Sequence, residues 1–425
     1  MRLQKNRGKL ILLEKNMLDN IPRFDLAKPP MKQHLRPLIW LLSFPDVIKH
    51  KNKLTKINME GIKPPYLLLC NHNAFMDFKV AEKAIFPHRA NYVVAIDGFW
   101  KREGLLRFIG CICKRKFTND ISLVRQLKRV TDRGDIAVIY PEARYSLCGT
   151  NAVLPESLGK LAKVLRVPVV TLICHGHHVN SPFWNLPDHG VVGTEAVMKC
   201  LFTAEQLETT NYKDVMKAIE KEFEYDDFKW QKEKGIKITY GDRAKGLHKV
   251  LYKCPMCKTE YKMTSGGTTL KCTACGKEWE MTELGELKAK TGATEFSHIP
   301  HWYEWERSEV RKEIENGTYG ITCTAQTDAL PNAKRYIDIG KSTLTHDMTG
   351  FTLTGNYNGE EYCVKLDAKS QYSVHIEYDY LGKKGDCVDL NTITDTLYVY
   401  PEGSDFSVTK MSLATEELYK HYSSL

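Results

Sequence analysis

The chain lacks the long apolar run that a membrane-spanning helix requires. None of its 425 residues lies in an uninterrupted stretch of 18 or more apolar residues, and a helix needs about 20 to cross a bilayer. A signal peptide is also not expected, because the apolar residues 10–13 are interrupted by Glu14 and Lys15 before an adequate hydrophobic core develops. The sequence therefore predicts a cytoplasmic protein without a transmembrane helix.

The sequence also predicts that the chain has no disulfide framework. The thirteen cysteines are an odd number, and four of them have the spacing of a metal site. Cys70, Cys111, Cys113 and Cys174 lie in apolar runs, where cysteines are usually buried as reduced thiols. The composition is 42% hydrophobic, which is enough to bury the cores of two to four domains in a chain of this length.

Positive charge is concentrated near the N-terminus. The net charge is +9, and residues 1–60 hold thirteen Lys and Arg against five Asp and Glu, an excess of eight. This distribution indicates an anionic partner, and both nucleic acid and anionic lipid satisfy it.

Residues 36–48 form a short apolar stretch that contains Trp40 and Phe44 and is followed by several lysines. The stretch is too short to span a bilayer, but aromatic and apolar residues beside lysines are typical of helices that lie in a membrane interface. The alternative is an N-terminal helix packed on the protein with a solvated charged face. We expect peripheral association with the inner face of the membrane.

The stretch 67–78 places a histidine and an aspartate directly after a predicted buried strand. Residues 66–70 have the length and composition of such a strand, and Asn71 and Asn73 favour a turn. The spacing of His72 and Asp77 allows the carboxylate to accept a hydrogen bond from one imidazole nitrogen, so that the other nitrogen remains basic. The alternative is a histidine that only caps a helix or satisfies the turn.

Strands and helices alternate through the following 150 residues. Strands are predicted at 92–96, 136–140 and 167–174, with helices at 75–85, 157–166 and 212–223. A further helix is predicted between its cap, Asn119 or Asp120, and Gly134, which terminates it. This alternation predicts an α/β fold, a mixed sheet flanked by helices, whose sites lie beyond the carboxyl ends of the strands. Glu142 would then lie at the same sheet edge as His72.

Four ordered blocks resemble the lysophosphatidate (1-acyl-sn-glycerol-3-phosphate) acyltransferase family of the glycerolipid acyltransferase superfamily. They are residues 71–77, residues 107–110 with the basic residues 114–116, residues 140–146, and residues 167–170. The chain departs from the family pattern at Ala74, where serine is usual, at residues 143–145, where Gly-Thr-Arg is usual, and at Thr171, where proline is usual.

The resemblance implies transfer of an acyl group from an acyl thioester, acyl-CoA or acyl carrier protein, to the hydroxyl of a lysophospholipid. The product from 1-acylglycerol-3-phosphate is phosphatidic acid. His72 would be the general base and Asp77 its orienting carboxylate. The substrate-binding candidates, which would hold the acceptor phosphate or orient its hydroxyl, are Glu142, Arg144, Lys114, Arg115 and Lys116.

A doubled Cys-x2-Cys pattern predicts a structural zinc site. The four residues are Cys254, Cys257, Cys272 and Cys275, and two such knuckles place four thiolates around one ion in a zinc ribbon. Redox-active or chance cysteines are the alternative. A closed four-cysteine site supplies no catalysis, so no catalytic metal or organic cofactor is expected.

The remaining sequence is rich in alternating strand-like runs and ends in a helical pattern. We predict four parts: a basic membrane-proximal segment 1–58, an acyltransferase domain 59–240, a zinc ribbon 250–285, and a β-rich domain 300–425. The last resembles a pleckstrin-homology barrel with a C-terminal helix in element order alone. The zinc ribbon or the β-rich domain can also recruit a protein partner.

Two other functions satisfy parts of the sequence. A metal-dependent hydrolase would use His72 and Asp77 as ligands, with further ligands from the cluster His175, His177 and His178. A non-catalytic scaffold would only recognise lipid with its first domain while the zinc ribbon and β-rich domain bind a partner.

Overall fold

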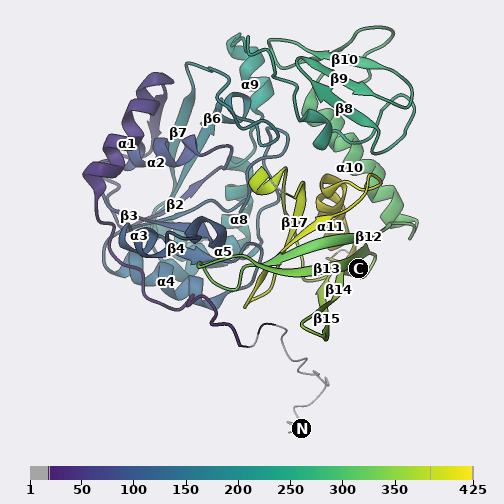
Figure 1. Cartoon of the computed structure of the whole chain (residues 1–425). Coiled ribbons are helices and arrows are strands. Elements are labelled where there is room, and N and C mark those ends of the chain that lie inside the picture. The colour runs from purple at the N-terminus through teal and green to yellow at the C-terminus, as the bar shows by residue number, and fades with distance from the viewer. Residues whose placement is uncertain (1–17, 19, 383, 424–425) are drawn as a thin grey trace.

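The first half of the chain is built around a mixed seven-stranded sheet (Figure 1). The structure is a computed structural model and describes residues 18, 20–382 and 384–423. In spatial order the strands are β1 (Lys53–Ile57), β7 (Glu195–Phe202), β6 (Val169–His175), β2 (Leu67–Cys70), β5 (Ile136–Ile139), β3 (Ala90–Ala95) and β4 (Ile112–Lys114). Only the β6–β7 pair is antiparallel, so β2, β5 and β6 end at the same edge.

Helices cover both faces of this sheet because side chains alternate along its buried strands. Leu67 and Leu69 share a core with α4 (Ile121–Asp132), α5 (Ser157–Leu165) and α8 (Tyr212–Glu222). Leu68 and Cys70 face the opposite core, to which α1 (Arg36–Lys49) and α2 (Met76–Ile85) contribute. The predicted α/β fold with helices on its two faces is thus confirmed.

Local sequence explains where the helices begin and which side they bury. In α4 the Asp120 carboxylate accepts the Ser122 backbone N–H at 2.7 Å, an N-cap that satisfies one of the free donors of the first turn. Leu123, Leu127 and Val130 recur at helical spacing and are buried.

The shorter helices are α3 (Glu103–Phe108), α6 (His177–Asn180), α7 (Ala204–Thr209), α9 (Asp227–Lys234) and the 3₁₀ helices Ile96–Phe99, Leu247–Lys249 and Tyr380–Gly382.

A small antiparallel sheet follows the α/β part. Its order is β11 (Leu287–Ala289), β10 (Glu278–Met281), β9 (Thr269–Cys272) and β8 (Met263–Gly266). Trp279 of β10 packs edge-on against Trp302 of α10 (Ile299–Glu315), with ring centroids 5.0 Å apart, and both rings are fully buried. The small sheet is therefore joined to the C-terminal part through α10.

The C-terminal part is a second seven-stranded sheet, entirely antiparallel, with α11 (Val408–Ser423) against it. The order is β15 (Glu360–Asp367), β14 (Gly350–Tyr357), β13 (Ile337–Asp347), β12 (Gly320–Ala329), β18 (Thr396–Pro401), β17 (Cys387–Asn391) and β16 (His375–Glu377). The expected antiparallel strands and final helix are confirmed, and within the described residues the strand order is linear, with β15 and β16 at its two ends.

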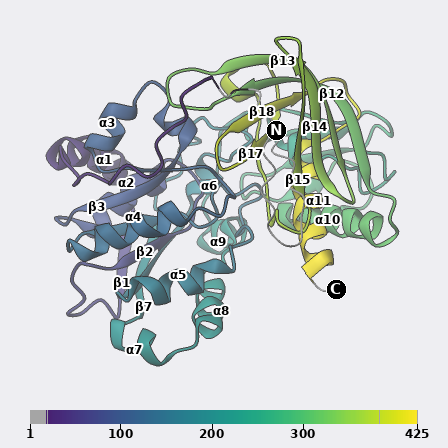
Figure 2. The same cartoon turned by 90° about the horizontal axis from the view of Figure 1, so that it is seen from below.

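The two large sheets lie side by side, and α1 lies on the side of the α/β part away from the C-terminal sheet (Figures 1 and 2). One buried cluster joins them: Phe99 and Cys113 from the α/β part pack with Leu330, Tyr398 and Tyr400 from the C-terminal part. No helix of the described residues combines the length and hydropathy needed to cross a membrane. Residues 1–17 and 19 of the basic segment lie outside the described part of the chain.

Three strands of the first sheet, β1, β4 and β7, are not among those predicted. β4 has only three residues, too few for a pattern to identify it. β1 is a short, lysine-containing edge strand whose residues are mostly exposed, so it has no apolar run to identify it. β7 alternates buried and half-buried residues along its length, and an alternation of period two is the sequence pattern that indicates a strand.

Candidate functional site

Three neighbouring strands deliver the candidate residues to one edge of the first sheet. His72 follows β2, Glu142 follows β5, and His177 follows β6, and β2 pairs in parallel with both of the others. The carboxyl ends of parallel strands are where sites form in such sheets, so residues distant in sequence meet here.

The asparagines beside His72 fasten its turn to β6. The Asn71 side chain donates to the Cys174 carbonyl at 2.9 Å and accepts the Cys174 N–H at 2.8 Å, which continues the pairing of β2 with β6 beyond the strand end. Asn73 accepts the Tyr225 hydroxyl at 2.9 Å. All these side chains are buried, so the turn that presents His72 is held rigidly.

Asp77 is the centre of the site. Its carboxylate is fully buried and contacts two histidines: Oδ2 lies 3.4 Å from His72 Nδ1, and Oδ1 lies 2.5 Å from His177 Nδ1. Oδ2 also accepts the backbone N–H groups of Asn73 at 2.5 Å and Ala74 at 2.9 Å. The predicted His72–Asp77 contact therefore exists in the structure, with a second imidazole on the other carboxylate oxygen.

These donors keep Asp77 ionised. Burial by itself favours the neutral acid, but the bonds from His177 and His72 outweigh it and hold the pKa of Asp77 at about 2. An ionised carboxylate on Nδ1 keeps the His72 proton on that nitrogen, which leaves Nε2 as the basic atom. About a quarter of the His72 side chain is exposed, so a substrate can reach it.

Two tyrosines enclose the His72 ring. The ring centroids of Tyr140 and Tyr145 lie 4.3 and 4.4 Å from that of His72. Both tyrosines belong to the loop that follows β5. The loop is bonded to the His72 backbone as well, since Ser146 donates its N–H to the His72 carbonyl at 2.8 Å.

Glu142 organises backbone at this site. Its side chain is fully buried, and its two oxygens accept the backbone N–H groups of His72 at 3.2 Å and Ala152 at 2.9 Å. Burial raises the pKa of Glu142 to about 8, against the lowering effect of these two bonds. The resemblance implies that Glu142 is a substrate-binding residue; in the structure it bonds the main chain of the candidate base.

The sequence placed His177 beside His72 and Asp77 only in the hydrolase alternative, as a metal ligand, and gave it no part in acyl transfer. It is 1% exposed, and its Nε2 atom has no hydrogen-bond partner among the described residues. Asp227 anchors its loop by accepting the N–H groups of Gly176 and His178 at 3.1 and 3.0 Å. Gly176 has a φ of +90°, and a Cβ there would lie 2.7 Å from Trp230, so the approach to His177 requires glycine.

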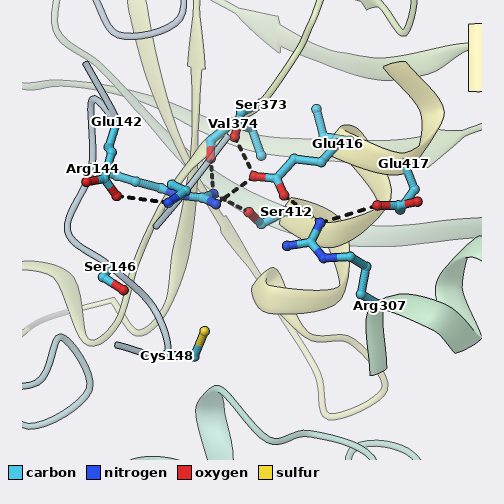
Figure 3. A network of polar contacts seen from close by, with 12 residues as sticks. Glu142, Arg144, Ser146, Cys148, Arg307, Ser373, Val374, Ser412, Glu416 and Glu417 are labelled. Carbon is cyan, nitrogen blue, oxygen red and sulfur yellow. Dashed lines mark hydrogen bonds and ion pairs between the residues drawn. The ribbon is translucent and has the colours of Figure 1, made fainter. Parts of the chain in front are cut away.

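Two of the predicted phosphate-binding residues have internal partners instead. Arg144 is buried and bonds Ser412, Glu416 and the Val374 carbonyl of the C-terminal part (Figure 3). Arg115 is 1% exposed and donates to Thr396 and to the carbonyls of Leu330 and Pro331. Both guanidinium groups connect the two large sheets, and none of their bonds among the described residues reaches His72 or Asp77.

The two predicted lysines are also engaged. Lys114 donates to the Thr118 carbonyl at 2.7 Å, and burial lowers its pKa. Lys116 lies 3.6 Å from Asp97 and 4.0 Å from Glu377. Glu377 in turn contacts His375 at 2.7 Å, and His375, Glu377 and Asp389 lie close enough together that they could hold a metal ion. The surroundings of Lys116 are therefore acidic, which opposes binding of a phosphate there.

The comparisons with known proteins address this part of the chain. A model of the acyltransferase family matches residues 47–175. The match includes His72, Asp77 and Glu142 and supports acyl transfer as the general chemistry. No curated protein matches the chain.

The solved structures that match part of this chain include one with a partly similar fold. It is the crystal structure of the 1-acyl-sn-glycerophosphate acyltransferase PlsC from Thermotoga maritima, with 12% sequence identity and a TM-score of 0.36. The similarity covers 44% of this chain and 76% of that chain.

The four predicted metal ligands lie outside the matched region and are close together. The Sγ atoms of Cys254 and Cys275 are 3.8 Å apart, and those of Cys257 and Cys272 are 3.7 Å apart. Metal–sulfur bonds of about 2.3 Å in a tetrahedron place the sulfurs about 3.8 Å apart. The four cysteines can therefore hold one tetrahedral ion.

The two cysteine pairs share one backbone pattern. Cys254 accepts the N–H of Lys258 and donates to the Thr259 carbonyl, and Cys272 accepts the N–H of Gly276 and donates to the Lys277 carbonyl. Each pair thus forms the same turn, as expected of two knuckles around one metal.

Replacing His177 tests whether it acts through Asp77. We expect His177→Leu to lower kcat/KM by about tenfold to hundredfold, since a bond to a charged group contributes about 1.5–3 kcal/mol. His177→Asn should retain most of the activity, because its amide N–H can donate from near the position of Nδ1. Steady-state kinetics of the two variants provide the measurement, and equal losses in both would contradict the role.

Proposed function

We propose that the protein transfers an acyl group from an acyl thioester to the free hydroxyl of a lipid acceptor. The observation that carries the proposal is the contact of His72 with the buried, ionised Asp77 at the edge of the sheet, inside the segment that matches the acyltransferase family. A base for the hydroxyl proton is the first requirement of acyl transfer to an alcohol.

In this reaction His72 Nε2 removes the proton of the acceptor hydroxyl while the oxygen attacks the thioester carbonyl. Asp77 holds the imidazole in the required tautomer and stabilises the imidazolium that forms. The thiolate then leaves and takes up the proton, and the acyl chain becomes an ester of the acceptor. The transfer is direct, without a covalent enzyme intermediate.

The acceptor that we propose is a lysophospholipid, 1-acylglycerol-3-phosphate, with acyl-CoA or acyl carrier protein as donor. This follows the resemblance of the four sequence blocks. The proposed phosphate site does not include Arg115 or Arg144, because their guanidinium groups have internal partners. Acyl-transfer kinetics with lysophosphatidate and with an uncharged monoacylglycerol as acceptor determine whether the acceptor phosphate contributes to binding.

Removal of the base is the primary test. We expect His72→Ala to lower the rate of lipid acylation by about 10²–10⁴-fold while the protein remains folded, because His72 is partly exposed. His88→Ala is the matched control, since His88 is an exposed histidine of the same segment. Thiol release from acyl-CoA with lysophosphatidate measures the rate, and wild-type turnover in His72→Ala would reject the catalytic assignment.

We also propose that the four-cysteine site holds a structural zinc ion. Protein prepared without chelators should contain one zinc per chain by elemental analysis. The double variant Cys254→Ser/Cys272→Ser should lose it, whereas Cys323→Ser, which changes a cysteine outside the cluster, should not. Zinc content near zero in the wild type, or unchanged in the double variant, would be incompatible with the site.

A further part of the proposal is peripheral binding to the inner face of the membrane through α1. The helix packs on α2 and buries Ser43 and Val47, yet Leu41, Leu42 and Ile48 are each more than 60% exposed. Trp40 and Phe44 pack edge-on against Phe86, at 4.7 and 5.8 Å between ring centroids. The helix therefore has features of both predictions for residues 36–48: one side is packed on the protein, and the exposed apolar residues form a ridge. Such a ridge can enter a membrane interface.

Vesicle co-sedimentation tests this surface. Binding to anionic vesicles should weaken with added salt, because charge attraction is screened over about 8–10 Å at physiological ionic strength. The double variant Leu41→Ser/Leu42→Ser should bind about tenfold more weakly, since buried apolar area is lost. Ile393→Ser removes an equally exposed residue of the C-terminal part and should have no effect; equal losses in both variants would exclude α1 as the membrane surface.

A further inference from the structure

The loop that follows β5 is one wall of the candidate site. Between residues 140 and 146 it contacts His72 in four ways: the rings of Tyr140 and Tyr145 pack against the imidazole, Glu142 accepts the His72 N–H, and Ser146 donates to the His72 carbonyl. The position of this loop therefore fixes the orientation of the candidate base.

Arg144 lies in the middle of that loop and points into the C-terminal part (Figure 3). Its guanidinium donates to Glu416 Oε1 at 2.6 Å, to Ser412 Oγ at 2.7 Å and to the Val374 carbonyl at 3.3 Å. Glu416 and Ser412 belong to α11, and Val374 directly precedes β16. One side chain thus connects the loop to two elements that are more than 200 residues away in sequence.

The connection is buried and charged, so breaking it is costly. Arg144 is 4% and Glu416 1% exposed. Burial favours neutral Glu416, but Arg144 and Arg307 outweigh it and hold the pKa of that carboxyl at about 2. Arg307 of α10 contacts the other oxygen at 2.7 Å, and Ser373 donates to Oε1 at 2.9 Å. Removing one partner of such a network leaves an uncompensated buried charge.

We propose that Arg144 is a positioning residue that, through Glu416 of α11, fixes the loop 140–146 against His72. On this proposal the C-terminal sheet and α11 complete the acyl-transfer site, in contrast to a separate module that only recruits a partner. The proposal rests on the proposed function, because its effect is read in the rate of acyl transfer.

The test compares the kinetics of variants at Arg144 and Arg307, the two arginines that contact the Glu416 carboxylate. Arg144→Met should lower kcat by about 10²-fold, the loss typical of a small misplacement of a reacting group, with little change in the KM for acyl-CoA. Glu416→Gln, which keeps the shape of the side chain, should also lower kcat. The double variant should be no slower than the slower single variant, because both changes break one connection.

Arg307→Met is the matched control. It removes the other cation of Glu416 from α10 and should lower the thermal unfolding temperature as Arg144→Met does. Because Arg307 does not contact the loop, this variant should keep kcat within about twofold of the wild type at temperatures where all the proteins are folded. An equal loss of kcat in Arg307→Met would mean that Arg144 matters only for stability and would overturn the proposal.

The pH profile supplies a second readout. Glu142 is faced by Arg144, Asp77 and Tyr225, and the positive charge of Arg144 lowers its pKa. The ionised form accepts both backbone N–H groups, so kcat should rise with pH through this ionisation. In Arg144→Met the rise should move to higher pH, and in Arg307→Met it should not. Unchanged kcat and an unmoved profile in Arg144→Met would refute the positioning role, whereas absence of activity in the wild type would refute the proposed function itself.

Discussion

The site depends on one buried carboxylate. Ionised Asp77 would be strongly unfavourable in the interior without donors, and the structure surrounds it with the N–H groups of Asn73 and Ala74 and with the imidazoles of His72 and His177. These donors come from the turn after β2 and from the segment after β6, so satisfying this one charge aligns two strand ends. In the proposed reaction the partly exposed imidazole of His72 is the base, and the buried imidazole of His177 supports Asp77.

Local patterns predicted the part of the site that is local in sequence. The buried strand 66–70, its turn and the helix after it follow from an apolar run, two asparagines and helical spacing, and they are sufficient to bring His72 to Asp77. The apolar run before Glu142 likewise placed that residue at the same edge. His177 lies one hundred residues beyond Asp77, and that pairing depends on the adjacency of β2 and β6, which no local pattern contains.

Charge was the weakest guide to the site. The resemblance and their positive charge predict a phosphate site at Lys114, Arg115, Lys116 and Arg144, but a sequence does not show which cations are buried or what they pair with. Their partners, among them Thr396 and Glu416, lie up to 281 residues away. Arg115, Lys116 and Arg144 contact residues of the C-terminal part, whereas Lys114 bonds the nearby Thr118 carbonyl. The C-terminal part is therefore continuous with one wall of the candidate site.

The fate of the thioester with and without an acceptor tests the central claim, direct acyl transfer by the His72–Asp77 pair, most directly. Acyl-CoA labelled in the acyl chain is incubated with the protein, alone or with lysophosphatidate or monoacylglycerol, and the products are separated. Direct transfer predicts thiol release only when an acceptor is present, with the label recovered in the acylated lipid. Release of free fatty acid at the same rate without an acceptor would identify a hydrolase and contradict the claim.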